Sequence, residues 1–205
     1  MAADEDIFES TRVPITGASP VGVGDAAGAE PAPNAGTNFP FNRTVTCKVP
    51  AQEQDLWCWA AVGTGIANYH AGSTILRQCE LVNQVFGGGD CCENGDSANC
   101  NQAGSLYTAL TTTENLAEAI PGTMSLGAVK DEISHQMPVG ARINWGDEIG
   151  HAVAIVGCRH APNQITLIVS DPAYGDGLIV SWRQFNNSYQ GVGTWSHAYR
   201  TKVKG

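Results

Sequence analysis

The sequence has little positive charge and no long hydrophobic segment. Among 205 residues, 11 are Lys or Arg and 20 are Asp or Glu, which gives a formal net charge of −9. This negative surplus disfavours nucleic acid or an anionic membrane surface as the main partner. No apolar run approaches the roughly 18 residues that indicate a membrane-spanning helix. We therefore expect neither a nucleic-acid partner nor a membrane partner, and we expect a monomer.

Large apolar side chains with a regular spacing are missing from the first part of the chain. The stretch "GASPVGVGDAAGAEPAPNAG" (17–36) follows neither a helical nor a strand period. Such a composition cannot bury enough surface to form a core. We interpret residues 1–43 as a flexible acidic tail, linker or pro-segment, and residues 44–205, from "TVTCKVP", as one compact domain.

A secretory signal is also missing from the printed N-terminus. "MAADEDIFES" (1–10) is acidic where a signal peptide would be basic and then apolar. Three explanations stay open: the signal has been removed, export uses another route, or the protein stays inside the cell.

Cysteine, by contrast, is plentiful. The seven cysteines lie at positions 47, 58, 79, 91, 92, 100 and 158. This density indicates an oxidising compartment, and hence a secreted or exported protein, and the odd number leaves at least one thiol unpaired in a monomer. Zinc is the competing explanation for "CCENGDSANC" (91–100), but structural zinc sites prefer ligand pairs separated by two to four residues. We favour disulfides and expect no metal and no other cofactor.

The disulfide connectivity stays open at this point. The cysteines available for pairing, apart from Cys58, are Cys47, Cys79, Cys91, Cys92, Cys100 and Cys158. Cys91 and Cys92 are not expected to bond each other because they are adjacent in the chain.

The apolar spacing changes from helical to alternating at Pro138. Before it, the pattern predicts helices over 58–71, 74–86, 105–111 and 125–137, with a cysteine-rich loop over 87–104. After it, strands are predicted at "VGARINW" (139–145), "HAVAIVGC" (151–158), "ITLIVS" (165–170), "GLIVSW" (177–182) and "TWSHAYRT" (194–201), with a short helix over 182–189. Helices followed by antiparallel strands indicate an α+β domain of two halves, with a cleft between them.

Cys58 lies where the first helical pattern begins, in "AQEQDLWCWAAVGTGIANYH" (51–70). A thiol attacks as its thiolate, which a helix N-terminus and an imidazolium partner both favour. The competing explanation is a packed or disulfide-bonded core cysteine. We interpret Cys58 as a nucleophile, and Trp57 and Trp59 beside it as packing residues.

The partners that a nucleophilic thiol needs occur later in the chain. His151 follows Gly150 at the start of an apolar strand, and Asp171 follows the next strand. A hairpin between these strands would bring them together, so we interpret His151 as the base and Asp171 as its orienting acceptor. The competing structural explanations are that His151 only ends a strand and that Asp171 only caps the turn before Pro172.

An oxyanion that forms at the substrate carbonyl needs hydrogen-bond donors. The backbone N–H of Cys58 is one candidate, and the amide of Gln52, six residues upstream, is the other. Gln54 competes with Gln52 for this role.

These motifs together resemble papain-like cysteine proteases. "QEQDLWCWAA" (52–61) is similar to their nucleophile segment, and the order Cys, His, acid matches. "GHAVAIVGCRHAPNQITLIVSDPAYG" (150–175) looks most like the bacterial branch, which includes effector proteases of plant pathogens and bacteriocin-processing enzymes. The resemblance covers about residues 44–203. It implies a papain-like fold of two parts, with Cys58 as nucleophile, His151 as base, Asp171 as orienting residue and Gln52 as oxyanion donor. Classical papain has Asn where Asp171 stands, and Cys-Gly-Ser where this chain has Asp55, Leu56 and Trp57.

Three functions are compatible with these residues. The first is a cysteine endopeptidase that acts on protein or peptide substrates through a thioester. The second is a glutamine deamidase or transglutaminase-like acyl transferase with the same triad. The third is a non-catalytic binding module that uses the stapled loop 87–104 for recognition.

Overall fold

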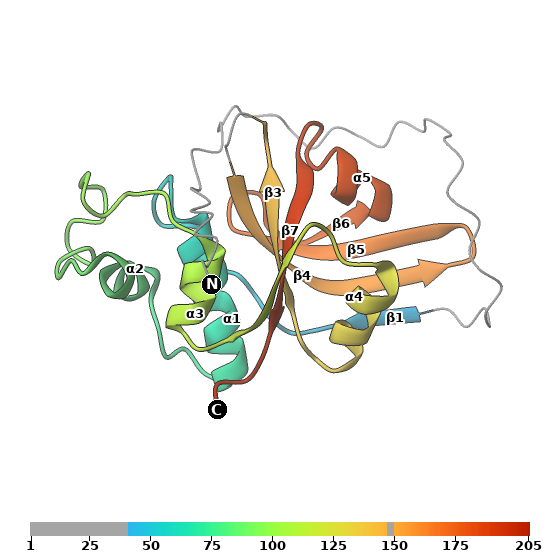
Figure 1. Cartoon of the computed structure of the whole chain (residues 1–205), viewed down its shortest axis with the longest axis horizontal. Coiled ribbons are helices and arrows are strands. Elements are labelled where there is room, and N and C mark those ends of the chain that lie inside the picture. Colours follow the sequence, from blue (N-terminus) through green and yellow to red (C-terminus); the bar gives the residue numbers. More distant parts are fainter. Residues whose placement is uncertain (1–40, 147–149) are drawn as a thin grey trace, which may run out of the picture.

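The protein has a helical half beside a half built on an antiparallel sheet (Figure 1). The computed structural model describes residues 41–146 and 150–205, so the tail expected over 1–43 lies almost entirely outside the described residues. The helical half contains α1 (Cys58–Ala71), α2 (Gln78–Phe86) and α3 (Leu106–Thr112). Two further helices, α4 (Leu126–Ser134) and α5 (Trp182–Asn187), lie beside the sheet. The α+β architecture expected from the sequence is therefore confirmed.

The sheet is antiparallel throughout and follows the order β2-β7-β3-β4-β5-β6, with β1 paired to β4. Its strands are β1 (Phe41–Thr44), β2 (Leu116–Pro121), β3 (Val139–Asn144), β4 (Gly150–Ala161), β5 (Gln164–Asp171), β6 (Gly175–Ser181) and β7 (Thr194–Thr201). The long strand β4 pairs with β3 over its first part and with β1 and β5 further along. Both faces of its first part are buried, which explains the continuous apolar run in its sequence.

Helix α1 is buried on nearly all sides instead of along one stripe. Its first ten residues are all buried, and its small residues let neighbouring segments come close. A Cβ on Gly63 would lie 2.8 Å from the Cβ of Ala109 on α3, and one on Gly65 would lie 2.9 Å from the carbonyl of Lys48. The helix therefore forms the centre of the helical half.

None of the helices within 41–146 and 150–205 is long and apolar enough to cross a bilayer.

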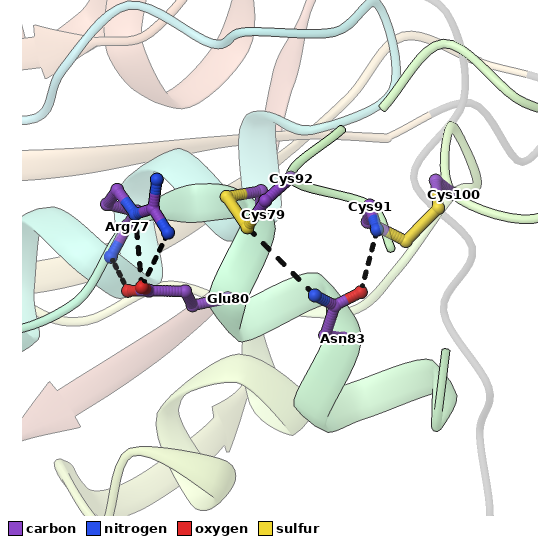
Figure 2. The surroundings of a disulfide bond; sticks show 7 residues. All are labelled: Arg77, Cys79, Glu80, Asn83, Cys91, Cys92 and Cys100. Atoms are coloured by element: carbon purple, nitrogen blue, oxygen red, sulfur yellow. Dashed lines mark hydrogen bonds and ion pairs between the residues drawn. A yellow bond between two sulfur atoms is a disulfide. The ribbon is translucent and has the colours of Figure 1, made fainter. Parts of the chain in front are cut away.

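Two disulfides staple the loop between α2 and α3, as Figure 2 shows. Cys79 on α2 bonds to Cys92, and Cys91 bonds to Cys100. Asn83 on α2 adds a polar tie, because its side-chain oxygen accepts a hydrogen bond of 3.0 Å from the backbone N–H of Cys91. The expected stapling of this loop is confirmed: its three cysteines all form disulfides, one of them with Cys79 on α2.

Some boundaries differ from the sequence-based expectation. Helix α2 begins at Gln78 rather than near residue 74, and α4 ends at Ser134 rather than at 137. Gln136 has a positive φ of 61° just before Pro138, which ends the helical conformation there. Strands β1 and β2 were not predicted, because β1 has only four residues and β2 is a mostly exposed edge strand with alanine and glutamate.

Candidate active site

The candidate nucleophile lies at the first residue of a helix. Cys58 begins α1, where the backbone N–H groups have no partner within the helix and the helix dipole is positive. The side chains of Trp57 and Trp59 are buried, as expected for packing residues. The indole N–H of Trp57 donates to the carbonyl of Cys100 at 2.8 Å, and that of Trp59 donates to the carbonyl of Gln102 at 3.3 Å. The stapled loop therefore holds both residues that flank Cys58.

The candidate base and its acceptor come together through strand pairing. Strands β4 and β5 are antiparallel, so the end of β5 returns to the beginning of β4. His151 Nε2 lies 2.8 Å from Asp171 Oδ1, and both side chains are fully buried. This distance fits a hydrogen bond in which the ring nitrogen donates to the carboxylate. The hairpin geometry expected from the sequence is what the structure contains.

The Asp171 carboxylate is surrounded by donors. In addition to His151, Oδ1 accepts hydrogen bonds from the backbone N–H groups of Ala173 at 2.8 Å and Tyr174 at 3.2 Å. Oδ2 accepts one of 2.6 Å from the hydroxyl of Tyr189, which is completely buried. Burial opposes the charged form of Asp171, but His151 and these donors outweigh it and keep the pKa of the carboxyl below its usual value.

Charge also decides the protonation state of His151. Burial alone would lower the pKa of the imidazole, but the Asp171 carboxylate, its hydrogen bond and the nearby Cys58 outweigh that effect and raise the pKa to about 10. Nδ1 is buried and, among the described residues, has no nitrogen or oxygen hydrogen-bond partner. Since Nε2 is engaged by Asp171, Nδ1 is the ring atom available for proton exchange with the thiol and the substrate.

Gln52 lies in the loop before α1, close to the turn that follows Asp171. Its backbone N–H donates to the carbonyl of Pro172 at 3.1 Å, which ties this loop to the turn after Asp171. Its side-chain Nε2 donates to the carbonyls of Gln54 and Asp55 at 3.0 and 2.9 Å, while Oε1 is buried without a described partner. Both amide protons are therefore used within the loop, and one would have to be shared with a bound oxyanion.

Gln54 occupies a different place. Its Nε2 would lie 3.0 Å from a Cβ on Gly95, so this side chain packs against the stapled loop.

Aromatic rings enclose the imidazole on two sides. The ring centroid of Trp145 lies 6.1 Å from that of His151, and the ring of Tyr174 meets His151 edge-on at 6.4 Å. Such rings keep water from the His151–Asp171 hydrogen bond and strengthen it. None of the rings of Trp145, Tyr174 and Tyr189 was predicted from the sequence to belong to the site. The only sequence signal was their position in the aromatic-containing turns that follow β3, β5 and α5.

Cys47 and Cys158 are free but chemically unlike Cys58 in their surroundings. Both are buried, and burial raises the pKa of Cys47 to about 12 and that of Cys158 to about 11. The described residues contain no cluster of three or more His, Cys, Asp or Glu side chains that could hold a metal ion.

Comparison with known proteins gives one family and several similar folds. The model of a family described as papain-like cysteine protease AvrRpt2 matches residues 40–190. A chain from the structures of the mite allergens Blo t 1 and Der p 1 is 16% identical with a TM-score of 0.50, over 95% of this chain and 76% of that one. Digestive procathepsin L 3 from the larval midgut of Tenebrio molitor is 15% identical with a TM-score of 0.48, over 78% of this chain and 67% of that one. No curated protein sequence matches the chain.

Proposed function

The chain belongs to the papain-like cysteine protease family AvrRpt2 and is a cysteine protease, and from this premise we propose that it is an endopeptidase with a Cys58–His151–Asp171 triad. The observation that carries the proposal is the buried His151–Asp171 pair, 2.8 Å apart, beside a cysteine at a helix start. Substrates of this class are proteins or peptides. We propose that the enzyme acts as a monomer and needs no cofactor.

The reaction begins from a thiolate on Cys58 and an imidazolium on His151. The thiolate sulfur attacks the carbonyl carbon of the scissile peptide bond and forms a tetrahedral oxyanion. The C–N bond then breaks, and Nδ1 of His151 gives its proton to the leaving amine, which leaves a thioester on the enzyme. A water molecule attacks the thioester carbon while neutral His151 takes its proton. The C–S bond breaks, the acid product leaves, and the thiolate–imidazolium pair is restored.

Asp171 and Tyr189 keep the imidazole in the orientation that this sequence of steps requires. The hydrogen bond from Nε2 to Asp171 leaves the proton that is exchanged on Nδ1. Tyr189 acts through Asp171 rather than on the substrate, since its buried hydroxyl donates to Oδ2, the carboxylate oxygen that does not accept from His151. We therefore assign Tyr189 as a positioning residue.

The oxyanion is stabilised by the backbone N–H of Cys58 and by the amide of Gln52. The first is supported by the position of Cys58 at the helix start. The second is supported by the tie between Gln52 and Pro172, which holds the glutamine near the triad. In this proposal, an Nε2 proton that contacts the Gln54 or Asp55 carbonyl is shared with the oxyanion when it forms.

We further propose that the protein works outside the reducing cytosol. Its two disulfides, Cys79–Cys92 and Cys91–Cys100, support export to an oxidising compartment, where such bonds persist.

The decisive experiment compares the protein with its Cys58→Ala variant on a denatured protein mixture. New peptide N-termini that depend on Cys58 support the endopeptidase. Ammonia release without new N-termini would support the glutamine-directed reaction instead. Cys158→Ala is the matched control, because this buried thiol lies on β4 and takes no part in the proposed chemistry.

Alkylation gives an independent test that requires no substrate. We expect iodoacetamide to label Cys58 stoichiometrically near pH 6, while Cys47 and Cys158, whose pKa values are raised to about 12 and 11, stay unlabelled. No labelling at pH 6 would contradict the reactive thiolate and favour a binding module.

A further inference from the structure

Residues 100–102 of the stapled loop 87–104 hold the segment that carries Cys58. Each of these three consecutive residues accepts a hydrogen bond from a residue within two positions of Cys58. The bonds run from the indole of Trp57 to the Cys100 carbonyl at 2.8 Å, from the backbone N–H of Leu56 to Asn101 Oδ1 at 3.1 Å, and from the indole of Trp59 to the Gln102 carbonyl at 3.3 Å. The loop therefore supports the chain on both sides of the candidate nucleophile.

The start of α1 has no side-chain cap that could replace this support. Trp57 occupies the N-cap position, where Ser, Thr, Asp or Asn would usually accept a hydrogen bond, and its side chain makes no capping bond. The loop backbone instead packs directly on the indoles. A Cβ on Gly95 would lie 3.1 Å from the ring of Trp57, and one on Gly104 would lie 2.3 Å from the ring of Trp59. The position of Cys58 thus depends on the conformation of the loop.

The Cys91–Cys100 disulfide fixes the supporting residues 100–102. It joins Cys100, the first of the three, to the beginning of the loop. Both of its cysteines are only 2% exposed, so a reductant in solution has little access to this bond while the loop is closed.

The Cys79–Cys92 disulfide is the accessible one. Cys92 is exposed, whereas Cys79 on α2 is buried. A thiolate opens a disulfide by attacking one of its sulfur atoms, and exposed disulfides are the labile ones. Reduction of the loop should therefore begin at Cys92.

The two disulfides are coupled to each other, as Figure 2 shows. Cys91 and Cys92 are adjacent in the chain, so a displacement of one moves the other. Asn83 on α2 contacts both: its Nδ2 donates to Cys92 Sγ at 4.0 Å, and its Oδ1 accepts from the backbone N–H of Cys91 at 3.0 Å. Opening of Cys79–Cys92 frees this part of the loop from its covalent tie to α2, which uncovers the buried bond.

We propose that the two disulfides form a redox switch, which a small-molecule thiol opens at Cys79–Cys92 first and at Cys91–Cys100 second. The second step loosens residues 100–102, and with them the segment around Cys58, so the protease becomes weaker while it stays folded. This inference rests on the proposed endopeptidase function and adds a regulation to it. The enzyme reaches full activity only in an oxidising compartment, where both bonds persist.

Each step is a thiol–disulfide exchange. The thiolate of the reductant attacks Cys92 Sγ and forms a mixed disulfide, and Cys79 leaves as a thiolate that takes up a proton. A second reductant thiolate attacks the reductant sulfur of the mixed disulfide and releases Cys92. Two electrons pass to the two cysteines, and the two reductant molecules leave joined as their own disulfide. The same exchange then opens Cys91–Cys100.

The test titrates the intact protein with reduced glutathione and follows thiol count, activity and fold together. Alkylation in denaturant with mass spectrometry should count three thiols with both bonds closed, five after one opens and seven after both. We expect the five-thiol form to carry label on Cys79 and Cys92 and to keep most of its kcat/KM. In the seven-thiol form, kcat/KM should be lower by about tenfold, because a buried positioning contact is lost.

Two further measurements separate the switch from other effects of glutathione. Activity is expressed per Cys58 that the mass map shows unmodified, so that oxidation of the nucleophile does not count as switching. Circular dichroism should stay unchanged in the seven-thiol form. Oxidised glutathione should then restore the three-thiol form together with its activity.

Variants assign the response to the individual bonds. In the Cys91→Ser, Cys100→Ser double variant, reduction of the remaining bond should change kcat/KM only slightly. In Cys79→Ser with Cys92→Ser, the remaining bond should open at a lower glutathione concentration than in the wild type, because α2 no longer holds the loop. Cys158→Ala is the matched control, since this buried thiol forms no disulfide and its loss should leave the redox response unchanged.

The inference is wrong if both bonds resist reduced glutathione, if Cys91–Cys100 opens first, or if the seven-thiol form keeps full activity. It is also wrong if activity falls only together with the circular dichroism signal, because that loss would be unfolding. Each of these outcomes leaves the endopeptidase intact, since the fully bonded protein still cleaves. Failure of the fully bonded protein with an unmodified Cys58 to cleave any peptide would instead overturn the proposed function, so the two failures are distinguishable.

Discussion

The two halves of the molecule hold their parts of the candidate site by different means. On the helical side, an irregular loop supports the segment around Cys58, and two disulfides fix that loop (Figure 2). On the sheet side, His151 and Asp171 are fixed by the pairing of β4 with β5 and by hydrogen bonds, and Cys158 on β4 forms no disulfide. Regular strand pairing already restricts the backbone, whereas a loop without such pairing gains most from covalent ties.

This difference implies that a substitution in one half should disturb the site residues of that half and leave those of the other half in place. Damage to the sheet side should disturb proton transfer while the nucleophile segment keeps its shape. Damage to the stapled loop should disturb the position of Cys58 while the His151–Asp171 pair remains. Variants from each half therefore test both the proposed roles and the comparison.

The largest effect is expected for His151→Ala on the sheet side. Loss of the group that protonates the leaving amine should lower kcat/KM by at least about 100-fold, and up to about 10,000-fold. Circular dichroism and the thermal midpoint Tm show whether the fold survives. His135→Ala, on the surface after α4, is the control and should keep nearly full activity. Retention of more than about a tenth of the activity in His151→Ala would exclude His151 as the base.

The next largest effect is expected for Gln52→Ala on the helical side. Loss of one oxyanion donor typically lowers kcat by about 100- to 1000-fold, with a smaller change in KM because the contact forms mainly in the transition state. The measurement is steady-state kinetics on one peptide substrate. Gln54→Ala is the matched control, since Gln54 packs against Gly95 on the stapled loop.

A larger loss of kcat in Gln54→Ala than in Gln52→Ala would reverse this assignment. Equal small losses would show that the second donor lies elsewhere. A large loss of Tm in Gln52→Ala would show that its bonds to the Gln54 and Asp55 carbonyls are mainly structural.

A smaller effect on activity should follow removal of the Cys91–Cys100 disulfide by a Cys91→Ser, Cys100→Ser double variant. The bonded residues are nine positions apart, so the chain-entropy model gives a loss of about 2–3 kcal/mol in the free energy of unfolding. For a domain of this size that lowers Tm by roughly 5–10 °C. We also expect kcat/KM to fall about fivefold well below Tm, because the carbonyl of Cys100 holds the indole of Trp57.

The second disulfide provides the control for this prediction. Cys79→Ser with Cys92→Ser should lower Tm by a similar amount, but should affect kcat/KM less, because that bond ties the loop to α2 and not to the segment around Cys58. Equal losses of activity in both double variants would mean that general loosening of the loop, and not the Cys100 contact, matters.

The sequence predicted the parts of the fold that local pattern determines. The start of α1 at Cys58 and the last strand over 194–201 agree with the structure, because helix starts and alternating strands have local signals. The edge strand β2 was missed because its pairing with β7 is decided far away in the sequence.

The residues of the candidate site also fall into two groups, those with a signal in the sequence and those without one. Cys58, His151 and Asp171 follow from motif and hairpin geometry, although their roles remain predictions. Tyr189 does not, since nothing in the neighbouring sequence shows that its hydroxyl meets Asp171. Likewise, the helical pattern over 58–71 does not show that α1 is buried on nearly all sides, which its Ala and Gly residues allow.

The smallest effect at neutral pH is expected for Asp171→Asn. An asparagine keeps the shape of the side chain, and its carbonyl oxygen stays directed at His151 because the N–H groups of Ala173 and Tyr174 also need that acceptor. The amide NH₂ would then face the Tyr189 hydroxyl, which can accept a hydrogen bond. The ring therefore keeps its orientation, and we expect kcat/KM to fall only about threefold at pH 6–7.

The pH profile should reveal the lost charge. Asp171 is the main group, ahead of Cys58, that raises the pKa of His151 to about 10 against the effect of burial, so its neutral replacement lets that pKa fall. The imidazolium needed to protonate the leaving amine is then lost at lower pH, and the alkaline limb of kcat/KM should move down by about 1–3 pH units. Asp176→Asn, at an exposed position on β6, is the control and should leave the limb unchanged. If the limb of Asp171→Asn stays in place, the carboxylate charge does not set the protonation of His151. A drop of several hundredfold at every pH would instead mean that the asparagine amide turns its NH₂ group toward the ring and reverses the tautomer.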